Sequence, residues 1–170
     1  MNIQIEPTRI DDLDEIFHLY NEAIAYQKKV GNNHWLGFER EMVEQELAEN
    51  RHFKILGNGH IIGTFLYTLS DPLIWKDANA IPAIYIHRIA TNPVARGNNL
   101  VEKIIEWSKA FAAANQLQYI RIDTGAGNDR LINYYIKCGF TYLGDTKVDY
   151  TPDLPLHYKD GSFALLQLAV

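Results

Sequence analysis

The chain has 170 residues, 47% hydrophobic and 22% charged, which suits one globular domain over residues 1–170 and excludes a collagen, a coiled coil and a disordered chain. Sixteen basic and twenty-one acidic residues give a formal net charge of −5, whereas nucleic-acid binders usually carry a basic excess. We therefore expect no nucleic-acid partner.

Hydrophobic patterning predicts the elements in the first half of the chain. Alternation over residues 3–5 indicates a short strand, and Thr8 with Asp11 three residues later is typical of the capping pair that opens a helix. The Asn58-Gly59 pair lies between two apolar runs, which is a strong hairpin signal because its turn requires positive φ. The expected elements are a strand at 3–5, helices at 10–24 and 38–47, strands at 53–56, 61–69 and 84–90, and a loop at 70–81.

The second half of the chain predicts two helices between strands. Apolar residues at helical spacing cover 98–115, and a second helix over 128–137 ends at Gly139. Strands are expected at 119–123, 140–143 and 163–170. The order β-α-α-β-β-β-α-β-α-β-β mixes hairpins with helical crossovers. The fold class expected is therefore α/β (α+β), with a mixed, mostly antiparallel central sheet of about six to seven strands flanked by about four helices.

Location and metal use are predicted from features that the sequence lacks. No apolar run approaches the roughly 20 residues of a membrane helix, and the N-terminus lacks the basic start of a signal peptide. The one cysteine, Cys138, has no partner for an intrachain disulfide, which suits a reducing compartment. The six histidines lack the paired helical spacing of a metal site. We expect a cytoplasmic protein with no membrane partner and no metal.

The turn before the longest predicted helix is a candidate phosphate site. Pro93-Val94-Ala95-Arg96-Gly97 runs directly into that helix, and a helix start leaves backbone N–H groups unpaired. These donors and the positive end of the helix dipole favour a phosphate group. Gly97 permits close approach of the backbone, and Arg96 adds a planar cation. Such a turn is also an ordinary connection, so the turn alone leaves both interpretations open.

Asn128 and Tyr135 add a second spacing signal. They are two helical turns apart and therefore share a face of their helix, and Gly139-Phe140 follows. Together with the strand at 84–91 and the Arg96-Gly97 turn, this spacing resembles the GNAT superfamily of N-acetyltransferases. The resemblance covers most of the chain and implies a single domain with the acetyltransferase (GNAT) fold.

The resemblance implies acetyl-CoA as the acyl donor, with its pantetheine arm beside the strand at 84–91 and its diphosphate on the turn. The family signature Arg/Gln-x-x-Gly-x-Gly/Ala starts at Arg96, and its two glycine positions hold Asn99 and Val101. Asparagine tolerates a left-handed backbone better than most residues, whereas valine adds two methyl groups near the pyrophosphate. Asn128 is alternatively only a helix N-cap. The implied donor-binding residues are Ile89, Ala90, Thr91, Arg96, Gly97, Asn98, Asn99, Leu100, Val101 and Asn128.

The two proton transfers of the implied reaction also have candidate residues. Tyr135 matches the family's tyrosine that protonates the departing CoA thiolate, and the ordinary tyrosine pKa of about 10 keeps a phenol protonated at neutral pH. The alternative is a core tyrosine. His87 is the general-base candidate by residue type, against a structural histidine or a water chain as the base. Asp123 either positions a cationic substrate or caps a turn.

The acceptor amine is expected to contact Tyr26 and Trp35, because the resemblance implies that the first two helices shape the acceptor pocket, and Asp123 is a third candidate for this contact. Trp35 is alternatively a core or surface aromatic residue. The implied function is an N-acetyltransferase that moves an acetyl group from acetyl-CoA directly to an amine of a small molecule or peptide, and dimerisation is common in the superfamily. Asn99 and Val101 keep open an alternative, a non-catalytic CoA-binding or ligand-sensing module of GNAT fold.

Overall fold

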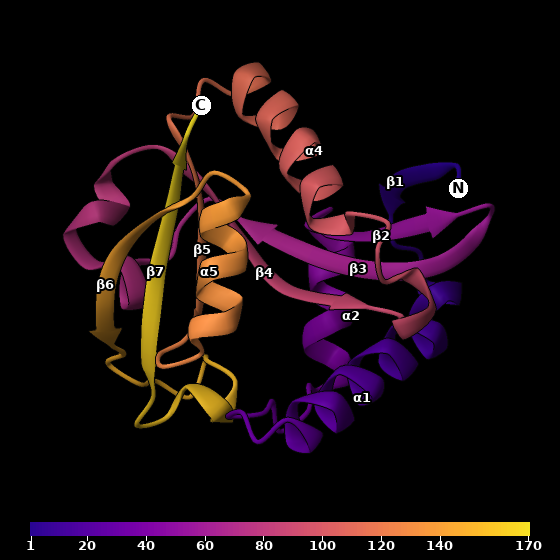
Figure 1. Cartoon of the computed structure of the whole chain (residues 1–170), viewed down its shortest axis with the longest axis horizontal. Helices are drawn as coiled ribbons and strands as arrows, with labels where there is room; N and C mark the ends of the chain where they lie inside the picture. The colour runs from indigo at the N-terminus through magenta and orange to yellow at the C-terminus, as the bar shows by residue number, and fades with distance from the viewer. The chain divides into compact units, whose positions relative to one another are not determined.

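Seven strands and five α helices make up the computed structural model, which describes residues 1–170 (Figure 1). The strands are β1 (Ile3–Pro7), β2 (His52–Gly57), β3 (His60–Thr68), β4 (Ala83–Thr91), β5 (Tyr119–Gly125), β6 (Thr141–Lys147) and β7 (Ser162–Ala169). The helices are α1 (Leu13–Lys29), α2 (Arg40–Ala48), α3 (Pro72–Trp75), α4 (Leu100–Ala114) and α5 (Asp129–Lys137). The predicted order of elements is confirmed, and α3 is added to it.

The strands form one sheet in the order β1-β2-β3-β4-β5-β7-β6. The pairs β1–β2, β2–β3, β5–β7 and β6–β7 are antiparallel, and the pair β4–β5 is parallel. The sheet is therefore mixed and mostly antiparallel, which confirms the predicted fold class. No helix has the length and apolar character that crossing a bilayer requires.

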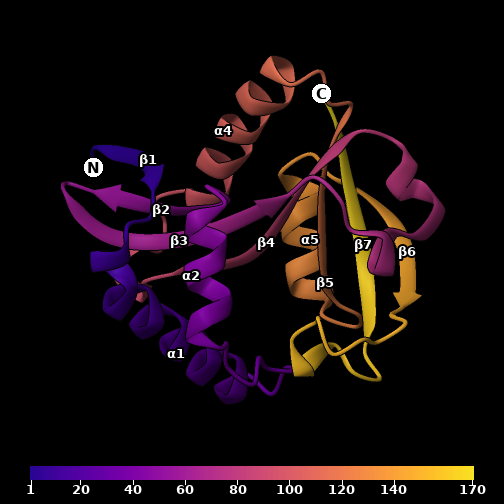
Figure 2. The same ribbon diagram turned by 180° about the vertical axis from the view of Figure 1, so that it is seen from behind.

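The contacts divide the chain into two compact units. Unit 1 contains Met1–Tyr67 and His87–Lys103, and unit 2 contains Thr68–Ile86 and Ile104–Val170. In unit 1, apolar side chains of α1 and α2 pack with Ala90 of β4, and α2 contacts β2 (Figure 2). The buried members of this cluster are Leu13, Ile16, Leu19, Tyr20, Val43 and Ala90.

The core of unit 2 encloses a buried arginine, Arg121 of β5. Its guanidinium donates to the side-chain oxygen of Gln167 at 2.9 Å and to the carbonyl oxygen of Ala78 and the hydroxyl of Tyr85, both at 2.8 Å. It also lies 4.8 Å from the ring centroid of Trp75. Arg121 therefore ties the segment between β3 and β4 to the sheet of this unit.

Two local predictions are corrected by the structure. The segment at 70–81 is not only a loop, because α3 begins at Pro72, a residue well suited to the first position of a helix. The capping pair expected at Thr8 and Asp11 is wrong, because the N–H of Arg9 donates to the carboxylate of Asp12 at 2.7 Å. A four-residue helix is too short to produce a periodic pattern, and caps are difficult to place to within one residue.

The predicted hairpin is confirmed. Gly57 pairs with His60, which leaves Asn58 and Gly59 as the two turn residues between β2 and β3. Their φ angles are +50° and +85°. Two positive φ values match the twist of the flanking strands, which explains the Asn-Gly sequence at this turn.

Thr8, which does not cap a helix, belongs to a buried chain of hydrogen bonds with His52 and Tyr20 in unit 1. Its hydroxyl shares a hydrogen bond of 2.8 Å with Nδ1 of His52, and Nε2 of His52 shares another of 2.8 Å with the hydroxyl of Tyr20. Burial, and then the charges of Arg88 and Arg51, lower the pKa of His52 to about 3. The imidazole is therefore neutral at physiological pH, with one ring nitrogen donating and the other accepting.

We expect His52 to make the stability of the protein depend on pH. An unfolded histidine has a pKa of about 6.5, so between about pH 6.5 and 3 the unfolded chain binds the proton that the folded chain refuses. The free energy of unfolding should therefore fall as the pH is lowered through this range, by about 1 kcal/mol per pH unit from this residue. Urea unfolding at several pH values measures the slope.

Two histidine variants test this assignment. His52→Gln should flatten the slope between pH 6.5 and 4, whereas His60→Gln, at an exposed position of β3, should leave it as in the wild type. Equal slopes in the wild type and His52→Gln would contradict the assignment.

Candidate active site

Strand β4 bends at Arg88, just before the predicted donor-binding residues. Its register pairs Ala83–Ile86 with Tyr119–Ile122 of β5, and Arg88 follows two residues later with φ +54°. A non-glycine residue in this region costs on the order of 1–3 kcal/mol, so it persists only where its surroundings hold it. Within a strand, a left-handed residue also redirects the chain that follows it. The predicted residues Ile89, Ala90 and Thr91 are that following chain.

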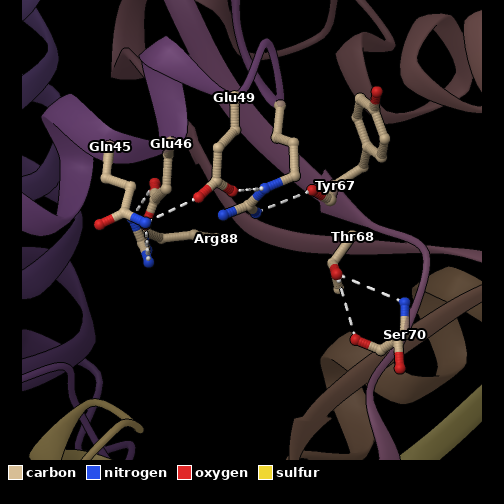
Figure 3. A network of polar contacts seen from close by, with 8 residues as sticks. Gln45, Glu46, Glu49, Tyr67, Thr68, Ser70 and Arg88 are labelled. Atoms are coloured by element: carbon tan, nitrogen blue, oxygen red, sulfur yellow. Dashed lines mark hydrogen bonds and ion pairs between the residues drawn. The ribbon is translucent and has the colours of Figure 1, made fainter.

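Arg88 is held by Glu46 of α2. Nη1 of Arg88 donates to Oε2 of Glu46 at 2.9 Å, and Nη2 donates to Oε1 at 3.0 Å (Figure 3). The guanidinium also lies 4.1 Å from the ring centroid of Phe38 and 5.6 Å from that of Tyr20. Sequence reasoning missed this pair. The available signal was a permanently charged residue within an apolar strand, because such a residue requires a partner when it is buried.

The turn into α4 contains two residues in the left-handed region. Gly97 has φ +84° and Asn99 has φ +52°. The carbonyl of Asn99 accepts from the N–H of Lys103 at 3.2 Å, so Asn99 caps the helix. The N–H groups of the next residues, Leu100 and Val101, therefore lie in the first turn, where a helix offers them no carbonyl. Asn99 adopts the backbone conformation for which glycine is the usual residue.

Arg96 and Tyr26 are brought together in unit 1. The guanidinium carbon of Arg96 lies 4.7 Å from the ring centroid of Tyr26, which is on α1 and 40% exposed. Such stacking limits the orientations of the guanidinium while leaving its charge accessible. Tyr26 was predicted to contact the acceptor, whereas the structure places it beside the turn predicted to hold the donor.

The two predicted residues of α5 differ in their surroundings. The side-chain oxygen of Asn128 accepts from the N–H of Leu131 at 3.3 Å, so Asn128 is the N-cap of the helix. Tyr135 is buried, and its ring packs edge-on against Phe140 with centroids 5.9 Å apart. Burial, with smaller effects of neighbouring groups that include Asp123, raises the pKa of Tyr135. The phenol is therefore protonated throughout the physiological range.

Asp123 of β5 has a second carboxylate close by. A carboxylate oxygen of Asp123 and one of Asp71 lie within 4.8 Å of each other in unit 2. Asp71 is buried directly before α3. Two carboxylates at this separation create a negative potential that favours a cation. Sequence reasoning missed Asp71, although an Asp before a proline is a recognisable helix-start signal.

The remaining predicted residues are His87 and Trp35. His87 lies half-buried on β4 next to Arg88, and its role as a base stays a prediction. Trp35 packs on the core of unit 1, with its ring centroid 5.4 Å from that of Phe38 and 6.3 Å from that of Tyr20. This packing favours the interpretation of Trp35 as a core aromatic residue.

Comparison with known proteins gives three informative relatives. The chain is 21% identical over 146 residues to "Uncharacterized N-acetyltransferase YesJ" of Bacillus subtilis, with 81% of each chain covered. It is similar in structure to a GNAT-family acetyltransferase from Listeria monocytogenes, with TM-score 0.78, 20% identity and coverage of 99% and 95% of the two chains. It is also similar to Naa50 of Arabidopsis thaliana in complex with a bisubstrate analogue, CoA-Ac-MVNAL, with TM-score 0.69, 12% identity and 100% coverage of both chains.

A family comparison gives the assignment. The model of the acetyltransferase (GNAT) family matches residues 12–140, which is more than half of the chain. The matched range includes the bent strand β4, the turn into α4 and helix α5. These matches show that the protein is an acyltransferase that belongs to the acetyltransferase (GNAT) family.

Proposed function

We propose that the protein transfers an acetyl group from acetyl-CoA directly to an amine of a small molecule or peptide. The observation that carries the proposal is the turn into α4, where two left-handed residues, Gly97 and Asn99, precede first-turn amides that lack helical partners. Unpaired amides at the start of a helix suit a diphosphate. The Naa50 complex holds a CoA derivative on a similar fold, which supports the same class of donor here.

The residues of unit 1 bind the donor in this proposal. The first-turn amides of α4 contact the diphosphate together with the exposed guanidinium of Arg96, which Tyr26 orients. The backbone of Ile89–Thr91 lies beside the pantetheine arm. Backbone N–H groups aimed at the thioester oxygen stabilise the negative charge that develops there, by roughly 2.7–4 kcal/mol per donor in other acyl-transfer enzymes.

Tyr135 and either His87 or water carry out the remaining chemistry in this proposal. The neutral amine attacks the thioester carbon, so a C–N bond forms and the C–S bond breaks. The Tyr135 phenol hydrogen-bonds to the departing thiolate and gives it a proton, and the proton that the attacking nitrogen loses in forming the amide returns to the phenolate through water. Its raised pKa makes it a donor at every physiological pH. The acceptor's own proton passes to His87 or to water, as predicted above.

Asp123 and Asp71 determine the class of acceptor in this proposal. Their paired carboxylates attract a positively charged amine and hold it before it loses its proton. We place the reaction in the cytoplasm, in keeping with a sequence that contains one cysteine and therefore no intrachain disulfide. We further propose that residues 1–170 act as one catalytic domain, with no nucleic-acid or membrane partner.

Acetyl transfer to a panel of amines tests the proposed function. Polyamines, amino acids, aminoglycosides and peptide N-termini are incubated with acetyl-CoA, and free thiol is followed together with the mass of the acceptor. A gain of one acetyl group per thiol released supports the enzyme. Saturable CoA binding without thiol release from any acceptor would support the non-catalytic module instead.

Replacing Tyr135 tests the proton donor. Tyr135→Phe keeps the buried ring but removes the hydroxyl, and general acid catalysis typically contributes about 100-fold or more. We expect kcat to fall by about that factor, with little change in the affinity for CoA. The matched control is Tyr134→Phe, which removes a hydroxyl from the exposed neighbouring position. Equal kcat values for both variants would contradict the role of Tyr135.

Replacing Asn99 tests the donor turn. Asn99→Gly retains access to φ +52°, so the affinity for CoA should stay within about twofold of the wild type. Asn99→Val places a β-branched residue in the left-handed region, and a strain of about 1–3 kcal/mol should weaken binding by about tenfold. Isothermal titration with CoA measures both constants. Unchanged affinity in Asn99→Val would show that the diphosphate lies elsewhere.

A further inference from the structure

Arg88 and Glu46 form a buried, bidentate ion pair. The side chains are 9% and 5% exposed. Both oxygens of the carboxylate accept from the guanidinium, at 2.9 and 3.0 Å. The parallel pair of hydrogen bonds fixes direction as well as distance.

A polar chain extends this contact through unit 1. The guanidinium of Arg88 lies 5.6 Å from the ring centroid of Tyr20, the Tyr20 hydroxyl shares a hydrogen bond with His52, and His52 shares another with Thr8. Because His52 is neutral and burial raises the pKa of Tyr20 to about 12, the Arg88–Glu46 pair is the charged part of this chain. The guanidinium is therefore held from two sides by groups on α1 and α2.

The stability of the fold does not by itself explain the buried Arg88–Glu46 pair. Buried ion pairs are often replaced by apolar residues without loss of stability, so they are weak evidence for a stabilising role. Here the pair acts on the one residue of β4 that has a left-handed backbone. Two hydrogen bonds and the Phe38 ring face allow the Arg88 side chain few orientations, and its backbone is thereby restricted as well.

We propose that Glu46 is a positioning residue for the acyl donor. By holding Arg88, it keeps the bend of β4 in place, and the bend directs the backbone of Ile89–Thr91 toward the pantetheine arm. This inference rests on the proposed function. Glu46 itself touches neither the donor nor the reacting atoms in this proposal, so its effect is expected on donor affinity and on the order of the strand.

The chain offers a matched control three residues away. Glu49 follows α2 and accepts from Nε of Arg51 at 2.6 Å, but its side chain is 41% exposed (Figure 3). Glu46→Gln and Glu49→Gln therefore make the same chemical change to a glutamate–arginine pair. Only the first acts on the bend of β4.

The experiment measures CoA binding, steady-state kinetics and amide hydrogen exchange for the wild type and both variants. For Glu46→Gln we expect CoA affinity to fall by about tenfold and the KM for acetyl-CoA to rise by a similar factor, with the KM for the acceptor within about twofold of the wild type. Exchange of the Ile89–Thr91 amides should become at least tenfold faster. Glu49→Gln should match the wild type throughout.

A double variant keeps the test valid if Glu46→Gln folds poorly. Glu46→Gln/Arg88→Gly leaves no buried charge unpaired, and glycine adopts the left-handed conformation freely. The bend is then accessible but no longer held, so the same loss of CoA affinity is expected. Thermal unfolding identifies the temperature at which each variant remains folded for the assays.

Three outcomes would overturn the inference. The first is wild-type CoA affinity and wild-type exchange in Glu46→Gln or in the double variant. The second is faster exchange of Ile89–Thr91 with unchanged CoA affinity, because the pair would then support the strand without positioning the donor. The third is failure of the wild type and Glu49→Gln to bind CoA, which would refute the proposed function and the inference with it.

Discussion

The contact between Arg88 and Glu46 places a full positive and a full negative charge out of water, within 3.0 Å of each other. Removing either partner would leave a buried charge uncompensated, at a cost of about 3–5 kcal/mol. The same contact opposes the cost of a left-handed residue in β4. The direction of the strand, and with it the place of the residues proposed to bind the donor, depends on this one electrostatic interaction.

The buried guanidinium groups of the two units have different kinds of partner. Arg88 donates to the carboxylate of Glu46. Arg121 donates to two uncharged side chains and a backbone carbonyl, and it lies against the ring of Trp75. In unit 1 the charged contact fixes a strained strand residue. In unit 2 the neutral contacts join the segment before β4 to the sheet. Asp71, directly before α3, belongs to that segment. The contacts of Arg121 therefore also hold in place the part of the chain that carries the Asp71 carboxylate, which lies near that of Asp123.

Local interactions made much of the fold predictable. The Asn58-Gly59 hairpin requires only the φ preferences of two residues, and the long helix α4 repeats its apolar positions over four turns. The α3 helix was missed because a single turn has no period. The Arg88–Glu46 pair was not predictable, because its partners are 42 residues apart and each alone resembles a surface charge.

The same limit applies to the candidate site. The left-handed backbone of the turn at Gly97 and Asn99 was predictable, because glycine and asparagine tolerate positive φ better than other residues. The tertiary contacts of the predicted side chains could not be predicted from the sequence. Tyr26 stacks on Arg96 and Trp35 packs in the core, although both were assigned to the acceptor by their position in the chain. Such assignments require the tertiary contacts, which no spacing rule provides.

Arg96 and Arg88 differ in their exposure to solvent. Arg96 is exposed on its turn, whereas Arg88 is covered by protein. At an ionic strength of 0.1 M, dissolved ions largely screen the interaction between exposed charges that are more than about 10 Å apart. They screen buried ion pairs much less. Changes in ionic strength are therefore expected to act on the proposed contact between Arg96 and an anionic donor, and to leave the buried Arg88–Glu46 contact in β4 unaltered.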